Sequence, residues 1–182
     1  GTSGQIWTSP DSGANWTARD SNRNWTGIAC SSDGTKLVAT NGSGNIYTST
    51  DSGANWTARD SSRSWVACAS SSDGSKLVAS VSGGQLYTST DSGVTWTPRD
   101  SSRNWLGVAS SANGTKLVAV TTGTQIYTST DSGANWTARD SNRNWIGCAS
   151  SADGVNLAAA VSAGGIYTST DSGVTWTLRS AA

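Results

Sequence analysis

The amino-acid sequence predicts an all-β protein built from one repeated unit of 40 residues. Short apolar stretches alternate with turns rich in Gly, Asp, Asn and Ser, and no apolar stripe keeps a helical spacing for two turns. Self-similarity at a fixed period of this length is typical of repeat architectures. Five tryptophans mark the period without an insertion or deletion: Trp16, Trp56, Trp96, Trp136 and Trp176.

Each unit divides into four predicted strands, which we call A to D in chain order. In the unit that begins at Trp25, turns of two to four residues separate the strands, and turns this short join antiparallel neighbours. The sequence therefore predicts a four-stranded antiparallel meander in every unit. The predicted ranges are 25–31 for A, 36–40 for B, 45–50 for C and 55–59 for D, with 60–64 as the connection to the next unit.

The way in which the units pack follows from their size. A four-stranded meander of about 40 residues cannot bury both of its faces alone, so neighbouring units must cover one another around an axis. This predicts a β-propeller, with the Gly- and Ala-rich A strands at the crowded centre and the Arg- and Thr-containing D strands at the outer edge. The chain forms one domain, 1–182: an outer half-blade at 1–22 with strands C and D only, then full blades at 23–62, 63–102, 103–142 and 143–182.

The turn between strands C and D carries the pattern Ser-x-Asp-x-Gly-x-x-Trp in every unit. In such a turn the carboxylate can cap backbone N–H groups, and Gly can adopt a positive φ. The pattern resembles the Asp-box (BNR) repeat, and the surrounding sequence is most similar to photosystem II assembly factors. The resemblance implies a propeller in which the box is a structural turn on the rim, away from ligand sites. The matching residues are Ser9, Asp11, Gly13 and Trp16; Ser49, Asp51, Gly53 and Trp56; Ser89, Asp91, Gly93 and Trp96; Ser129, Asp131, Gly133 and Trp136; and Ser169, Asp171, Gly173 and Trp176.

The half-blade leaves the closure of the ring open to three interpretations. Copies of the chain can combine into a larger ring or filament, the chain can be a fragment of a longer propeller, or four blades can close alone with the half-blade as an appendage. We favour a homo-oligomer or polymer joined through the half-blade, because exposed strand edges recruit partners and head-to-tail contacts generate rings or filaments.

The inventory of reactive side chains argues against catalysis. The chain has no His and no Glu, which excludes Ser-His and Cys-His pairs and also the tyrosine nucleophile assisted by Glu that a resemblance to sialidases implies. The Asp residues lie in turns or follow Arg at the end of strand D, where caps and ion pairs are expected. Cys30, Cys68 and Cys148 are expected to be small buried side chains, because metal ligation lacks His and any C-x-x-C motif. We predict no enzymatic activity, no metal and no cofactor.

A second repeated segment, Arg-Asn-Trp or Arg-Ser-Trp, lies where strand D connects to the next strand A, on the same face as the B–C turns. A tryptophan flanked by planar donors suits sugar rings or acidic groups, so one shallow ligand site per blade is one interpretation. The alternative is structural: each tryptophan wedges between blades while Arg covers its edge. The residues are Arg23, Asn24 and Trp25; Arg63 and Trp65; Arg103, Asn104 and Trp105; and Arg143, Asn144 and Trp145.

Charge and hydropathy limit the partners. Twelve basic and twelve acidic residues cancel, which disfavours nucleic acid, and no apolar run reaches the roughly 20 residues of a membrane helix, so no membrane insertion is expected. Scarce charge and abundant Ser, Thr, Asn and Gly favour a secreted or cell-surface protein, as a mature chain whose signal peptide is not in view.

We predict a non-enzymatic extracellular structural or adhesive protein that assembles with its own copies. The alternatives are a multivalent carbohydrate-binding propeller that binds glycans and a protein-docking scaffold.

Overall fold

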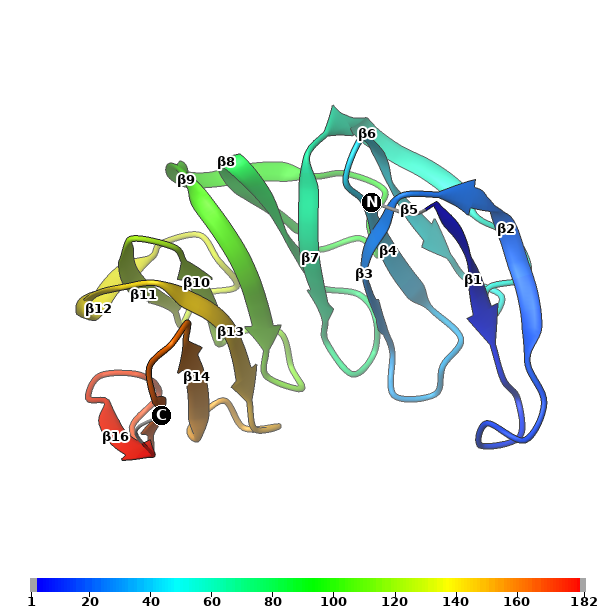
Figure 1. Ribbon diagram of the computed structural model, residues 1–182. Helices are drawn as coiled ribbons and strands as arrows, with labels where there is room; N and C mark the ends of the chain where they lie inside the picture. Colours follow the sequence, from blue (N-terminus) through cyan, green and yellow to red (C-terminus); the bar gives the residue numbers. More distant parts are fainter. Residues whose placement is uncertain (1–2, 181–182) are drawn as a thin grey trace.

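The computed structural model describes residues 3–180, and in this range the chain consists of β-strands joined by turns, without a helix. Figure 1 shows the strands arranged as successive sheets along an open arc, with β1 and β2 near one end and β13 to β16 at the other. The all-β prediction is therefore confirmed. In chain order the strands are β1 (Gly4–Thr8), β2 (Thr17–Arg23), β3 (Trp25–Cys30), β4 (Leu37–Asn41), β5 (Gly44–Ser49), β6 (Thr57–Arg63), β7 (Trp65–Ser70), β8 (Leu77–Ser89), β9 (Thr97–Ser110), β10 (Leu117–Thr121), β11 (Thr124–Ser129), β12 (Thr137–Arg143), β13 (Trp145–Ser150), β14 (Leu157–Val161), β15 (Ile166–Ser169) and β16 (Thr177–Ser180).

The strands form one two-stranded hairpin followed by four antiparallel meanders. The hairpin is β1–β2, blade 1 is β3 to β6, and blade 4 is β13 to β16. In between, β8 supplies positions B and C of blade 2, while β9 supplies position D of blade 2 and position A of blade 3. The predicted four-stranded antiparallel blades are therefore present, and the predicted half-blade is the β1–β2 hairpin.

The outer strands of blades 1 to 3 differ from their predictions. The predicted D strand ends at 59, whereas β6 runs from Thr57 to Arg63, so most of the expected connection is strand. A bulge explains the extension: Asp60 has a φ of 49°, and the register with β5 shifts between Gly44 and Ile46 so that Gly44 faces Arg63. Only one residue, Ser64, then separates this strand from the next blade.

The apolar core lies between blades rather than inside any one of them. Val38 and Ile46 of blade 1 are fully buried in one cluster with Trp65 of blade 2. The same relation joins blade 2 to blade 3 and blade 3 to blade 4. Each meander therefore obtains its core from its neighbour, as the packing argument predicts. The corresponding tryptophans are Trp65, Trp105 and Trp145.

The A strands pack closely along the inner side of the arc. A Cβ added to Gly107 would lie 3.4 Å from the Cα of Gly147 in the next blade. Backbone hydrogen bonds also link consecutive A–B turns, because Ser32 N donates to Ser72 O and Ser72 N to Ala112 O, each at 2.7 Å. These contacts confirm the predicted inner position of strand A.

The C–D turns attach each blade to the one before it. Ser132 and Gly133 both have positive φ values, 59° and 83°. A Cβ added to Gly133 would lie 2.6 Å from Thr88 Cγ2 of the preceding blade and 3.2 Å from Leu117 Cδ1. Glycine is required here both for its backbone conformation and for the space it leaves.

We therefore expect Gly133→Ala to destabilise the protein by about 1–3 kcal/mol more than Gly13→Ala, because only the former adds an overpacked contact between blades. Gly13 has a similar φ of 89°, but its added Cβ meets only Trp16 of its own turn, at 3.7 Å. The two variants thus share the backbone strain, and urea unfolding measures the difference. Equal losses would show that the close contact with Thr88 is relieved at no cost.

Candidate functional site

The repeated Arg-Asn-Trp segments lie beside the B–C turns, as predicted. Gly42 N donates to Asn24 O at 2.9 Å, and Ser162 N donates to Asn144 O at 2.8 Å. The segment and the turn therefore form one edge of each blade. The equivalent bonds in the two middle blades run from Ser82 N to Ser64 O and from Thr122 N to Asn104 O.

The tryptophans of these segments are largely enclosed. Trp65, Trp105 and Trp145 are at most 1% exposed. Each packs edge-on against a tyrosine of its own blade, as Trp105 does against Tyr127 at 5.1 Å between ring centroids. These three rings offer no face on which a sugar could stack, and they occupy the wedge position of the structural alternative. Only Trp25 is partly exposed.

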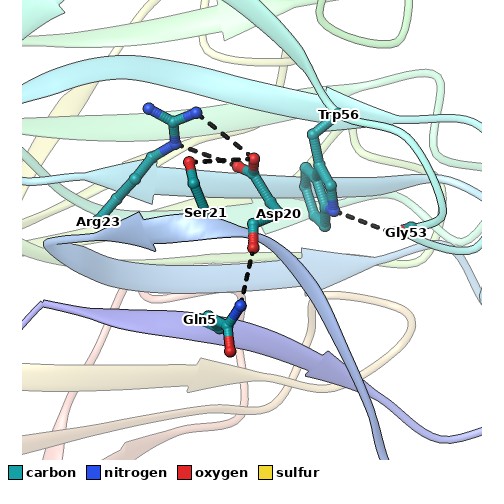
Figure 2. A network of polar contacts seen from close by, with 6 residues as sticks. All are labelled: Gln5, Asp20, Ser21, Arg23, Gly53 and Trp56. Atoms are coloured by element: carbon teal, nitrogen blue, oxygen red, sulfur yellow. Dashed lines mark hydrogen bonds and ion pairs between the residues drawn. The ribbon is translucent and has the colours of Figure 1, made fainter.

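The arginines of the same segments hold this edge together. Figure 2 shows Arg23 paired with Asp20, with 3.1 Å between Nε and Oδ2. The guanidinium of Arg23 also lies over the Tyr47 ring, 4.4 Å from its centroid, an arrangement that favours a cation on the ring face. The same ion pair recurs in the later blades, for example between Arg63 and Asp60 at 3.3 Å. The arginine therefore links two units, because its ion pair lies within the outer strand of one unit and the ring beneath it belongs to the next.

Strand D of each unit carries a second arginine, and this arginine does not pair with the aspartate that follows it. The residues are Arg19, Arg59, Arg99, Arg139 and Arg179. Arg19 Nε donates instead to Thr8 Oγ1 at 3.0 Å, within its own hairpin. The equivalent bond recurs in each blade, for example from Arg139 to Thr128 at 3.0 Å. This series braces strands C and D and forms no ion pair among the described residues.

The aspartates of the turns act as caps. Asp131 accepts hydrogen bonds from Asn135 N at 2.9 Å and from Asn135 Nδ2 at 2.7 Å, and Ser129 Oγ donates to it at 2.8 Å. These bonds favour the charged carboxylate and lower the pKa of Asp131 to about 2, with the backbone bond from Asn135 as the largest cause. A carboxyl group held in this way is a poor proton donor at neutral pH.

The cysteines show no feature of a reactive site. Burial raises the pKa of the Cys68 and Cys148 thiols to about 12, so neither is a nucleophile at neutral pH. Cys30 is exposed, contrary to prediction, because no blade covers that side of β3. Residues 3–180 contain no disulfide and no group of three or more side chains suited to a metal. No helix in this range could cross a membrane.

The start of the arc presents an apolar surface, which we call the leading face. Trp7, Trp16 and Ile28 are 53%, 59% and 52% exposed. Trp7 and Trp16 line a cavity of about 770 Å³ that also reaches Cys30 and Gly34. A smaller groove beside it is lined by Ile28 and Trp25. In the full blades the A and B strands cover the residues equivalent to Trp7 and Trp16, and the β1–β2 hairpin has no such strands beside it.

The end of the arc presents the opposite surface, which we call the trailing face. Ile166 is 50% exposed, although its repeat equivalents Ile46, Leu86 and Ile126 are fully buried. A Cβ added to Gly147 would have nothing within 4 Å. Ile28 on the leading face and Ile166 on the trailing face thus occupy the two sides of the contact that joins consecutive blades inside the chain. The residues of the two faces could not be predicted from the sequence, because they occupy the same repeat positions as buried residues.

No protein-family model matches the sequence, and no curated protein matches it either. Solved structures do match. The GH74 enzyme of Niastella koreensis superposes with a TM-score of 0.66 at 25% sequence identity, over 89% of this chain and 25% of the enzyme. YCF48 bound to a D1 peptide superposes with a TM-score of 0.68 at 17% identity, over 97% of this chain and 60% of YCF48. The computationally designed Ika4 protein gives 0.66 at 12% identity, over 84% of this chain and 94% of Ika4.

The fold is therefore a β-propeller fold of four-stranded antiparallel blades. The chain spans a quarter of the GH74 enzyme and less than two thirds of the peptide-bound YCF48.

Proposed function

We propose that this chain is a protein-docking scaffold without enzymatic activity, and that the protein it docks is a second copy of itself. The observation that carries the proposal is the exposure of Ile28. This side chain is 52% exposed on the leading face, whereas Val108, at the same repeat position, is 9% exposed against the preceding blade. A trailing face of a second copy supplies the surface that the preceding blade supplies inside the chain.

The residues that would meet at the junction between two copies are complementary in size. Inside the chain Cys68 lies against Val38 and donates its Sγ–H to the Val38 carbonyl at 3.6 Å. The equivalent pair between two copies is Ile28 on the leading face and Ala158 on the trailing face. A larger residue on one side is offset by a smaller one on the other, and volume-conserving exchanges are the ones that packed cores tolerate best.

The backbone of the trailing face is also in register for a second copy. Each A–B turn donates one hydrogen bond to the turn that follows, and the last one inside the chain runs from Ala112 N to Ala152 O at 2.7 Å. The next donor in this series is Ala152 N, and the first acceptor position of a second copy is Ser32 O. A backbone bond between them continues the series across the junction.

The first test is the mass in solution of Ile28→Asp beside that of the unmodified chain and of Val94→Asp. Val94 is 56% exposed but lies in a C–D turn away from both faces. We expect the unmodified chain and Val94→Asp to form oligomers whose masses are multiples of the chain mass of 18.6 kDa. Burial of an unpaired carboxylate is costly, so Ile28→Asp is expected to weaken assembly at least tenfold. A monomeric unmodified chain at all concentrations, or equal effects of both substitutions, would contradict the proposal.

Three further parts of the proposal have separate support. The hydrogen-bonded Ser, Asp, Gly and Trp of the C–D turns support their assignment as Asp boxes of the BNR type. The polar, weakly charged composition supports an extracellular structural or adhesive setting. The absence of His and Glu and the use of Asp as turn caps support the lack of enzymatic activity.

A further inference from the structure

Two hairpins of the chain occupy the same positions of the repeat. The β1–β2 hairpin supplies positions C and D before blade 1, and the β15–β16 hairpin supplies positions C and D of blade 4. Ile6 of the first hairpin and Trp25 line the same groove, the relation that Ile46 has to Trp65 inside the chain. When blade 4 of one copy docks on the leading face of another, both hairpins would need this one place.

We propose that the two hairpins exchange on assembly: β15–β16 leaves its blade, and β1–β2 of a second copy pairs with the vacated edge of β14. The inference rests on the proposed function and specifies how the junction forms. The exchange accounts for the exposure of Trp7. Its repeat equivalent Tyr47 pairs with Ala39 and is 9% exposed, and β14 would offer Ala159 to Trp7 in the same register.

The turn that precedes β15 favours the release of this hairpin. Ala163 has a φ of 50°, where the equivalent residues Gly83 and Gly123 are glycines with φ values of 67° and 78°. A left-handed alanine is strained relative to glycine, and strained short hinge turns favour exchange of an element between copies. Ile166, the first residue of β15, is half exposed in the unexchanged chain.

The two hairpins also differ in their internal bracing. In β1–β2, Gln5 Nε2 donates to Asp20 O at 3.2 Å, and Arg23 pairs with the Asp20 carboxylate (Figure 2). The residue equivalent to Gln5 in β15–β16 is Gly165, which has no side chain to make this bond. The N-terminal hairpin therefore has more stabilising side-chain contacts of its own than β15–β16, and it is the hairpin expected to keep the position that both would need.

A disulfide between copies tests the exchange directly. Ala158 faces Thr168 in blade 4, as Val38 faces Thr48 in blade 1; after exchange Ala158 faces Thr8 of the second copy instead. We expect Thr8→Cys/Ala158→Cys, in a Cys30→Ser background, to form covalently linked copies on mild oxidation. Within one chain the two positions lie on strands at opposite ends of the arc (Figure 1), so an intramolecular bond is not available. The two single-cysteine variants are the controls and should give no more than background cross-linking.

A second variant locks the hairpin in place. Ala158→Cys/Thr168→Cys, in the same background, joins β14 to β15 inside one chain when it is oxidised. We expect the oxidised protein to assemble at least tenfold more weakly than the same protein after reduction. Because the oxidised and reduced samples have one sequence, the comparison separates the lock from any effect of the substitutions.

The outcomes distinguish this inference from the proposed function. Linked copies in the first variant, together with redox-dependent assembly in the second, support the exchange. Assembly of the unmodified chain without the 8–158 link, and without any effect of the lock, would overturn the exchange and leave self-docking in place. A chain that stays monomeric at all concentrations would overturn both.

Discussion

Trp105→Ala is expected to destabilise the protein by about 3–5 kcal/mol, the usual cost of removing a fully buried large aromatic side chain. Trp105 has no exposed surface and lies in one cluster with Val78 and Leu86 of blade 2 and with Tyr127 of its own blade. Truncation therefore opens a cavity at the centre of a contact between two sheets. It also removes the edge-on contact with Tyr127, which contributes beyond the buried area.

Trp105→Phe is the matched control, because it keeps an aromatic ring at the site. We expect it to lose less than half as much stability as the alanine variant, as measured by the urea concentration at the unfolding midpoint. A loss below about 1 kcal/mol for Trp105→Ala would be typical of a surface position. Such a result would mean that the contact between blades 2 and 3 is not a packed core.

The strand order and the turn chemistry could be predicted from the sequence because both are local. Turns such as Ser32-Asp33-Gly34 carry their own hydrogen-bonding groups, and Ser31, Asp33 and Thr35 form that network in the structure. The end of strand D could not be predicted in this way. It depends on the positive φ of Asp60, and no neighbouring residue signals which aspartate adopts it.

The role of the repeated tryptophans depends on residues far away in the sequence. Trp65 with its neighbour Arg63 could equally form an exposed stacking platform or an interior wedge. The choice is made by Val38 and Ile46 of the preceding blade, which close over the ring. The sequence pattern of one unit does not show where Val38 and Ile46 of the preceding unit lie, so both interpretations were open.

The exposure of the leading and trailing faces could not be predicted either, because it does not depend on the sequence of any one unit. Ile28 and Ile166 have the same place in the repeat as Cys68 and Ile126, which pack against neighbouring blades. Their exposure results from the position of their blade in the arc and not from any local feature. One signal was available, namely the change from Val38 to Ala158 in the last unit, but its meaning requires the pairing with Ile28.

Acid is expected to unfold the protein steeply, and the aspartates of the turns are the groups responsible. The pKa values of Asp51, Asp91, Asp131 and Asp171 are lowered to about 2, in each case mainly by hydrogen bonds from the residue four positions later. The pKa of Asp33 is also lowered to about 2, chiefly by the hydrogen bond from Ser31 Oγ. A depressed pKa in the folded state contributes stability above the unfolded value of about 3.9 and loses it as the pH falls toward the folded value.

The free energy of unfolding should therefore be nearly constant from about pH 8 to pH 6 and fall between about pH 5 and pH 2. The plateau is expected because the chain has no His, the side chain whose ordinary pKa of about 6.5 falls in this range. Denaturant titrations at a series of pH values measure the profile. A loss of stability centred near neutral pH would contradict this assignment.

One of the A–B turns supplies a natural control for the acid effect. Asn113 takes the place of aspartate there, and its Oδ1 accepts from Thr115 N at 3.0 Å and from Ser111 Oγ at 2.9 Å. The amide thus makes the capping bonds without a titrating proton. We expect the triple variant Asp33→Asn/Asp73→Asn/Asp153→Asn to keep most of its stability at pH 7 and to lose less of it between pH 5 and pH 2. A variant that unfolds in acid as steeply as the unmodified chain would show that the A–B caps do not contribute, and that the C–D turns alone carry the pH dependence.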